Sequence, residues 1–95
     1  MAVYGYVRGS NAAQEEMQRD RLASSGIAFD GVFAEAWEDF LPRVGEGDKV
    51  VAVSVNRLSR DPDECRARVE MLALVGAEFA SLSDDGVVGR WASSV

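Results

Sequence analysis

Residues 5–14 read GYVRGSNAAQ and mark the passage from a strand to a helix. The residues before them, 1–7, alternate in polarity and are rich in β-branched and aromatic side chains, so we expect a first strand that ends at Gly9. Ser10 then stands where a hydroxyl can cap the free amides of a following helix, and this structural role is the simplest one. The alternative is a serine nucleophile with an arginine, Arg8, two positions before it.

The other elements are predicted from apolar periodicity and turn residues. Ala13, Met17 and Leu22 give a first helix at 11–25 a modest apolar face. The remaining predicted elements are a second strand at 27–34, a short or kinked helix at 37–44, a third strand at 49–55, a third helix from 62 to about 75, a fourth strand at 77–82, a turn at 84–86 and a tail at 87–95.

Particular residues define the ends and the burial of these elements. Pro42 shortens or kinks the second helix, and its apolar Trp37 and Phe40 are expected in the core, or else exposed as an interaction patch. The third strand is apolar almost throughout, which is typical of a strand that is covered on both faces and central in a parallel sheet. Asp61 is the expected N-cap of the third helix, with Glu64 as its partner in a capping box.

The alternation of strands and helices predicts an α/β fold. We expect residues 1–95 to form one small three-layer domain, in which a mostly parallel four-stranded sheet is flanked by helices. Ligands of such sheets bind beyond the carboxyl ends of the strands. Arg8 and Ser10 follow the first strand, and Arg57 and Arg60 follow the third, so a phosphate site would form if these strands are neighbours. Taken alone, the two loop arginines are more simply explained as solvated surface residues that offset the acidic excess.

Composition limits the possible chemistry. The chain of 95 residues has 10 Lys and Arg against 16 Asp and Glu, a net charge of -6. Most of its surface would repel a phosphate backbone, so contact with nucleic acid needs a local basic cluster or a partner. A single cysteine, Cys65, and no histidine exclude Ser-His-Asp and Cys-His catalysis and the usual zinc sites. We expect Cys65 to be buried and inert, and we expect no metal and no cofactor.

The N-terminus lacks the layout of a signal peptide, and no apolar run approaches the roughly 20 residues that cross a bilayer. We therefore expect a cytoplasmic protein without membrane contact.

Several motifs stand in order along the chain: GYVRGS at 5–10, QRDRL at 18–22, Gly-Asp at 47–48 before a strand, and RLSR at 57–60 after it. Together they resemble the catalytic domain of the serine site-specific recombinases, the resolvase/invertase family, from about residue 3 to residue 82. The resemblance implies that the serine attacks a DNA phosphate and forms a phosphoserine link. It also implies that the cleaved ends are exchanged within a tetramer and then rejoined. The implied roles are Ser10 as nucleophile, Arg8, Arg57 and Arg60 as phosphate clamp, and Gln14, Gln18 and Asn56 as supporting residues.

Four features depart from the family's pattern. Asn56 replaces the usual Asp, and an amide cannot accept a proton. The mobile Gly-rich loop that the family carries between the positions of Glu35 and Trp37, with a further active-site arginine, is missing. Gly9 stands where a β-branched residue is common, which should loosen the backbone before Ser10. The chain also lacks a long dimerisation helix, whose start would correspond to positions 89–90, and a DNA-binding helix-turn-helix domain.

These departures favour a catalytically impaired domain that acts as a regulatory or protein-binding version of the fold in site-specific DNA recombination. Its partner would be a full-length recombinase or a second copy of itself, with DNA bound weakly or through that partner. The alternative is an active minimal serine recombinase that cleaves and rejoins DNA through a phosphoserine at Ser10. A third hypothesis is that the chain is a remnant of such a domain without a function.

Overall fold

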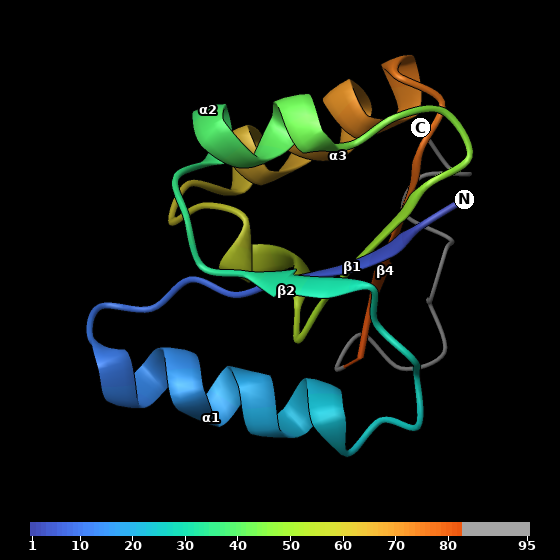
Figure 1. Cartoon of the computed structure of the whole chain (residues 1–95). Coiled ribbons are helices and arrows are strands. Elements are labelled where there is room, and N and C mark those ends of the chain that lie inside the picture. Colours follow the sequence, from blue (N-terminus) through green and yellow to red (C-terminus); the bar gives the residue numbers. More distant parts are fainter. Residues whose placement is uncertain (83–95) are drawn as a thin grey trace.

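A parallel β-sheet forms the centre of residues 1–82, the part of the chain that the computed structural model describes. In this part the sheet has four strands in the order β2-β1-β3-β4, and every neighbouring pair is parallel. Helix α1 covers one face, and α2 and α3 cover the other (Figure 1). The predicted three-layer α/β domain is confirmed, with a sheet that is parallel throughout. The elements are β1 (Val3–Tyr6), α1 (Ala12–Ala23), β2 (Gly31–Phe33), α2 (Trp37–Phe40), β3 (Lys49–Ala52), α3 (Pro62–Leu74) and β4 (Glu78–Ser81).

The side chains of each strand alternate between the two faces, and this divides the core in two. On the face covered by α2 and α3, Tyr6 is fully buried together with Phe40 and Phe79. On the face covered by α1, Val7 is buried together with Leu22. Burial of a large apolar side chain contributes about 1.5–3 kcal/mol, so packing from both sides fixes the central strands in place.

Strands β1 and β3 lie side by side in the middle of the sheet, with Gly5 paired to Val51. The third strand ends at Ala52, before its predicted end, because its ladder with β4 finishes where the Ala52 carbonyl accepts from the Leu82 amide at 3.1 Å. The chain then forms a 3-10 turn at Val55–Arg57. Since parallel strands share one carboxyl edge, the loops that follow β1 and β3 lie together.

The N-cap of α1 is Asn11, so the prediction that Ser10 caps this helix was wrong. The helix begins one residue later than expected, and Asn11 Oδ1 accepts from the amide of Gln14 at 3.0 Å. The Ser10 side chain is therefore not used for capping.

The apolar face predicted for α1 was wrong in part. Leu22 is fully buried, but Ala13 is exposed and Met17 is 62% exposed. A buried position of this helix is instead taken by Gln18, which is 3% exposed. A polar side chain can hold such a place only when its hydrogen bonds are made, and its partner lies elsewhere in the chain.

The short second helix agrees with the prediction from Pro42. Helix α2 has a single turn and continues as a 3-10 turn at Leu41–Arg43. Its Trp37 and Phe40 are buried in the core and do not form an exposed patch. The strand before it, predicted over 27–34, pairs with β1 only over Gly31–Phe33, toward its C-terminal end.

The start of α3 follows the prediction for the cap but not for the capping box. Asp61 Oδ1 accepts from the amide of Asp63 at 3.0 Å, and Pro62 is the first helical residue. The Glu64 carboxylate pairs instead with Arg68 in the next turn of the helix.

None of the helices in residues 1–82 is long and apolar enough to cross a bilayer. The predicted turn at 84–86, the tail and positions 89–90 lie outside the described residues.

Candidate active site at the carboxyl edge of the sheet

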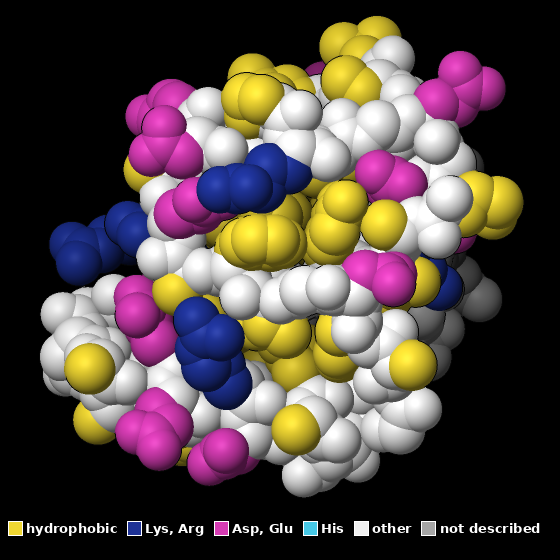
Figure 2. Space-filling view, viewed as in Figure 1, with side chains coloured by type: hydrophobic (Ala, Val, Ile, Leu, Met, Phe, Trp, Pro, Cys, Tyr) yellow, Lys and Arg dark blue, Asp and Glu magenta, His cyan; other side chains and the backbone are white. Residues whose placement is uncertain are grey.

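A cavity of about 280 Å³ lies between the loop after β1 and the segment after β3. Basic side chains project from the edge of the molecule where β1 ends (Figure 2). The structure brings together in this cavity every residue with a predicted site role except Gln18, which does not line it. The first loop contributes Arg8 and Ser10, the start of α1 contributes Gln14, and the segment after β3 contributes Asn56, Arg57 and Arg60.

The charge of this cavity is opposite to that of the whole chain. None of its lining residues is acidic, although the chain carries a net charge of -6. Arg8, Arg57 and Arg60 are exposed, and none of them forms an ion pair within residues 1–82. Unpaired guanidiniums around one hollow can hold a phosphate through charge-assisted, bidentate hydrogen bonds. The cavity thus supplies the local basic cluster that an acidic chain needs in order to bind a polyanion.

Gln14 holds the backbone at Ser10. Gln14 Oε1 accepts from the Ser10 N–H at 2.8 Å. A Cβ placed on Gly9 would lie only 2.6 Å from the Gln14 Cβ, so glycine allows the loop to approach α1 closely. We expected Gly9 to loosen this backbone, and the structure shows it closely packed. The exposed Ser10 hydroxyl makes no hydrogen bond within residues 1–82 and is available as a nucleophile.

Gln18 holds the backbone of Arg8 in place without lining the cavity itself. Both ends of its buried side-chain amide pair with the backbone of Arg8. Because a fully satisfied buried polar pair is rigid, the Arg8 side chain leaves the protein from a fixed point beside the cavity.

Asn56 lies at the exposed rim of the cavity. Its Oδ1 accepts from the hydroxyl of Ser54. An amide cannot take up a proton from Ser10, and no described residue that lines the cavity is a carboxylate or a histidine. The cavity therefore offers charge stabilisation but no general base of its own.

Arg68 is a fourth arginine of the cavity, and sequence reasoning missed it. Its Nη2 donates to Glu64 Oε1 at 2.6 Å, its Nη1 donates to the Leu58 carbonyl, and its guanidinium lies 5.4 Å from the ring centre of Trp37. The residue thereby ties the arginine-bearing segment to α3. The signal in the sequence is the i, i+4 spacing of Glu64 and Arg68, which pairs side chains on one helix face.

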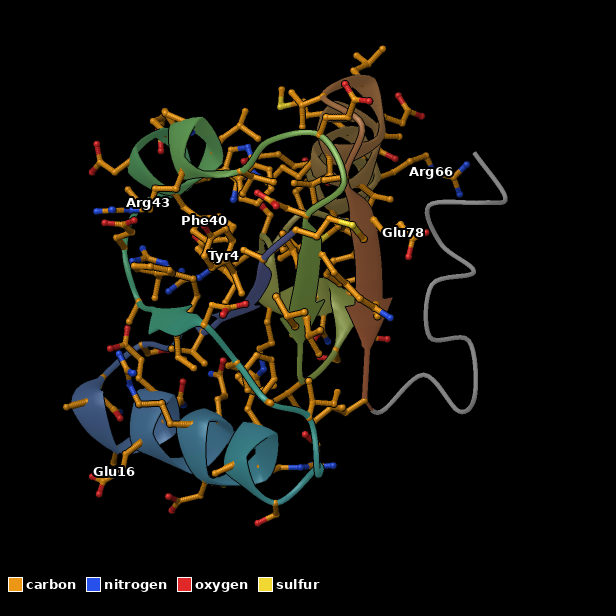
Figure 3. All side chains as sticks on the ribbon, turned by 45° about the vertical axis from the view of Figure 1, so that its right-hand side comes forward. Tyr4, Glu16, Phe40, Arg43, Arg66 and Glu78 are labelled. Atoms are coloured by element: carbon orange, nitrogen blue, oxygen red, sulfur yellow. The ribbon has the colours of Figure 1, made fainter. Side chains whose placement is uncertain are left out.

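Arg43 does not line the cavity. Its Nε donates to Glu35 Oε1 at 2.5 Å, and this hydrogen bond raises the pKa of Arg43. The guanidinium lies 4.8 Å from the ring centre of Phe33. Figure 3 shows it beside Tyr4 and Phe40, on the aromatic side of the core.

Two buried groups, Tyr6 and Cys65, keep their protons at neutral pH. Burial raises the pKa of Tyr6, whose hydroxyl donates to the Glu35 carbonyl at 2.7 Å. Burial also raises the pKa of Cys65, whose thiol donates to the Ser59 carbonyl at 3.2 Å. The prediction that Cys65 is buried is confirmed.

Residues 1–82 contain no group of three or more His, Cys, Asp or Glu side chains placed to hold a metal ion.

The same fold is found in a solved structure. The chain is similar to the N-terminal catalytic domain of TP901-1 integrase, with a TM-score of 0.67 over 86% of this chain and 77% of that one, at 18% sequence identity. The fold is that of an integrase catalytic domain. No protein-family model matches the sequence, and no curated protein matches it. At this level of identity the similarity shows the fold, and the activity has to be argued from the cavity.

Proposed function

We propose that this chain is a serine recombinase-like domain of site-specific DNA recombination, and that its cavity holds a DNA phosphate. The observation that carries the proposal is the convergence of Arg8, Arg57 and Arg60 around Ser10 in one cavity without acidic residues. The solved neighbour is, by its name, the catalytic domain of an integrase, which supports a role in recombination. In phosphoryl transfer, one preorganised donor is typically worth about a hundredfold or more in rate.

The arrangement fits a reversible transfer of a DNA phosphate to serine. Ser10 Oγ would attack the phosphorus, and the bond from phosphorus to one sugar oxygen would break as that oxygen takes a proton. The hydroxyl proton of Ser10 would pass to water or to a group on a partner. Attack by a free sugar hydroxyl on the phosphoserine would rejoin the strand and return Ser10 to its free form. The arginines would neutralise the non-bridging oxygens throughout.

We propose further that the domain cleaves DNA poorly on its own. A serine hydroxyl is a weak nucleophile unless a base takes its proton, and the cavity has Asn56 where a base is needed. The chain would then act as a regulatory or protein-binding domain that pairs with a full-length recombinase or a second copy of itself. Weak DNA binding by the isolated chain agrees with its net charge of -6.

One observation favours an active enzyme as the second candidate. The Ser10 hydroxyl is exposed and unbonded within the described residues, and its backbone is already held in place by Gln14. An active minimal serine recombinase would use this hydroxyl to form the phosphoserine without help from a partner.

The test is a search for a covalent protein–DNA adduct. Wild type, Ser10→Ala, Arg8→Gln and Arg57→Gln are incubated with a pool of nicked duplexes of random core sequence, with and without a full-length recombinase. Bound DNA is measured by native gel shift, and adducts are identified by denaturing gel and mass spectrometry. We expect DNA binding that weakens with Arg57→Gln, and adducts that are rare for the chain alone. Frequent Ser10-linked adducts from the chain alone would favour the second candidate. DNA binding unaffected by Arg8→Gln and Arg57→Gln would contradict both.

A further inference from the structure

A second cavity adjoins the one lined by arginines, and we propose that it takes the heterocyclic base of a nucleotide whose phosphate is bound beside Ser10. Its volume is about 170 Å³. Asn56, Ser59 and Arg60 line both cavities, so the two cavities are neighbours. A group attached to a phosphate in the first cavity would therefore lie next to the second. This inference rests on the proposed binding of phosphate in the first cavity and names the class of nucleotide that the site would accept.

The exposed wall of the second cavity is mostly apolar, although Asn56 and Ser59 also line it. Val55, Pro62 and Cys65 line it, and proline has no backbone N–H to donate. The Cys65 thiol is already used in its hydrogen bond to the Ser59 carbonyl at 3.2 Å, and burial keeps it neutral by raising its pKa. Such walls offer little to a phosphate or to a sugar rich in hydroxyls, and they suit the face of an aromatic ring.

Two arginines also line this cavity. Arg60 and Arg66 both line it, both are exposed, and neither forms an ion pair within residues 1–82. Figure 3 shows the Arg66 side chain extending away from α3. A planar guanidinium stacks on aromatic faces and is attracted by their π electrons. Apolar side chains that pack against a base, together with guanidiniums that stack on it, are a combination that suits an unpaired base.

The position of this cavity next to the phosphate site restricts the substrate. A base in an intact duplex is stacked and paired, so it can enter a protein cavity beside its own phosphate only after it has swung out of the helix. The site would therefore prefer single-stranded or locally melted DNA over intact duplex.

The experiment compares four ligands on the whole chain by NMR: inorganic phosphate, methyl phosphate, and the 3′- and 5′-monophosphates of thymidine. The amides of Ser10 and Arg57 report on phosphate, and the Val55 methyl groups report on a nearby ring. We expect at least one thymidine phosphate to bind about tenfold more tightly than methyl phosphate, with shifts of the Val55 methyls that methyl phosphate does not cause.

Two variants and a control sharpen this comparison. Arg66→Gln should abolish most of the tenfold advantage of the nucleotide and leave the affinity for methyl phosphate unchanged. Val55→Phe should do the same by filling the cavity, and if this variant does not fold, Arg66→Gln still decides. Arg21→Gln, an exposed change on α1, should alter neither affinity.

The outcomes separate this inference from the proposed function. If phosphate and methyl phosphate shift the Ser10 amide but nucleotides bind no more tightly, the base site is refuted and the phosphate site stands. An advantage that survives Arg66→Gln without any shift at Val55 would place the base elsewhere and also refute it. If no ligand moves the Ser10 or Arg57 signals, the proposed function fails and this inference falls with it.

Discussion

The side-chain amide of Gln18 brackets the backbone of Arg8: its Oε1 accepts from the Arg8 N–H at 3.0 Å, and its Nε2 donates to the Arg8 carbonyl at 2.6 Å. Gln18 is 3% exposed, so one buried side chain satisfies two backbone groups at the end of β1 and joins them to α1. The loop that carries Ser10 starts from this anchored residue. The geometry of the candidate site therefore depends on a contact that does not touch the cavity.

Replacing Gln18 by leucine should damage both stability and binding. The change leaves the N–H and carbonyl of Arg8 without partners, so we expect the free energy of unfolding to fall by about 2 kcal/mol. Phosphate affinity should also fall, because Arg8 is no longer held. Urea denaturation and NMR titration measure the two effects. Glu16→Gln on the outer face of α1, where Figure 3 shows Glu16 pointing away from the sheet, is the matched control and should change stability by less than about 0.5 kcal/mol.

Gly9→Ala should disturb the loop at Ser10. The new methyl group would lie 2.6 Å from the Gln14 Cβ, so the loop must move and its hydrogen bond from the Ser10 amide to Gln14 is lost. We expect a loss of about 1–3 kcal/mol in stability and weaker phosphate binding. Gly45→Ala is the control, since its nearest added contact, to Asp48 Oδ2, is an ordinary 3.7 Å. Equal behaviour of the two variants would show that the close approach at Gly9 does not matter.

Arg68→Lys should weaken the site although it keeps the charge. A lysine cannot reproduce the planar fork that reaches both the Leu58 carbonyl and Glu64. We expect stability to fall by about 1 kcal/mol and affinity for inorganic phosphate to fall with it. Arg66→Lys, at an exposed arginine of the same helix without an ion pair in the described residues, should leave both unchanged. An Arg68→Lys variant with unaltered phosphate affinity would remove Arg68 from the site.

Asp48 should make stability depend on acid pH. Its carboxylate accepts from the amides of Ala2 and Gly45, each at 2.8 Å, and these bonds lower its pKa in the folded chain. A lowered folded-state pKa gives stabilisation that is present above the unfolded value, about 4, and is lost as pH falls through the folded value. Asp48→Asn should therefore be less stable than wild type at pH 7, and the difference should shrink below about pH 4. Urea midpoints measured across this range test the sign, and a difference that stays constant with pH would contradict it.

Local patterns in the sequence predicted most of the fold. Apolar runs and turn residues gave the order of strands and helices, and Asp61 and Pro62 marked the start of α3 correctly. The sequence could not show that β1 and β3 are neighbours, because strand order depends on packing of the whole chain. The predicted cap at Ser10 failed because Asn11, one residue later, is an equally good cap.

The sequence allowed us to predict only those site residues that are charged and directly follow a predicted strand. Arg8, Arg57 and Arg60 could be placed in this way once the two strands were assumed to be neighbours. The backbone contacts that position the site could not be predicted, since Gln18 bonds the backbone of Arg8 and Arg68 bonds the Leu58 carbonyl, each ten residues away along the chain. Backbone groups have the same chemistry in every residue, so their pairing leaves no trace in the sequence.

Above all, we propose that Arg8, Arg57 and Arg60 hold a phosphate beside Ser10. Titration of the isotope-labelled chain with phosphate and then vanadate, followed by NMR at these residues, tests it most directly. We expect shifts that saturate together at these four residues, are lost in Arg57→Gln and are absent at Arg21 on α1. A well-folded spectrum in which these four signals stay still while the ligand concentration rises would contradict it.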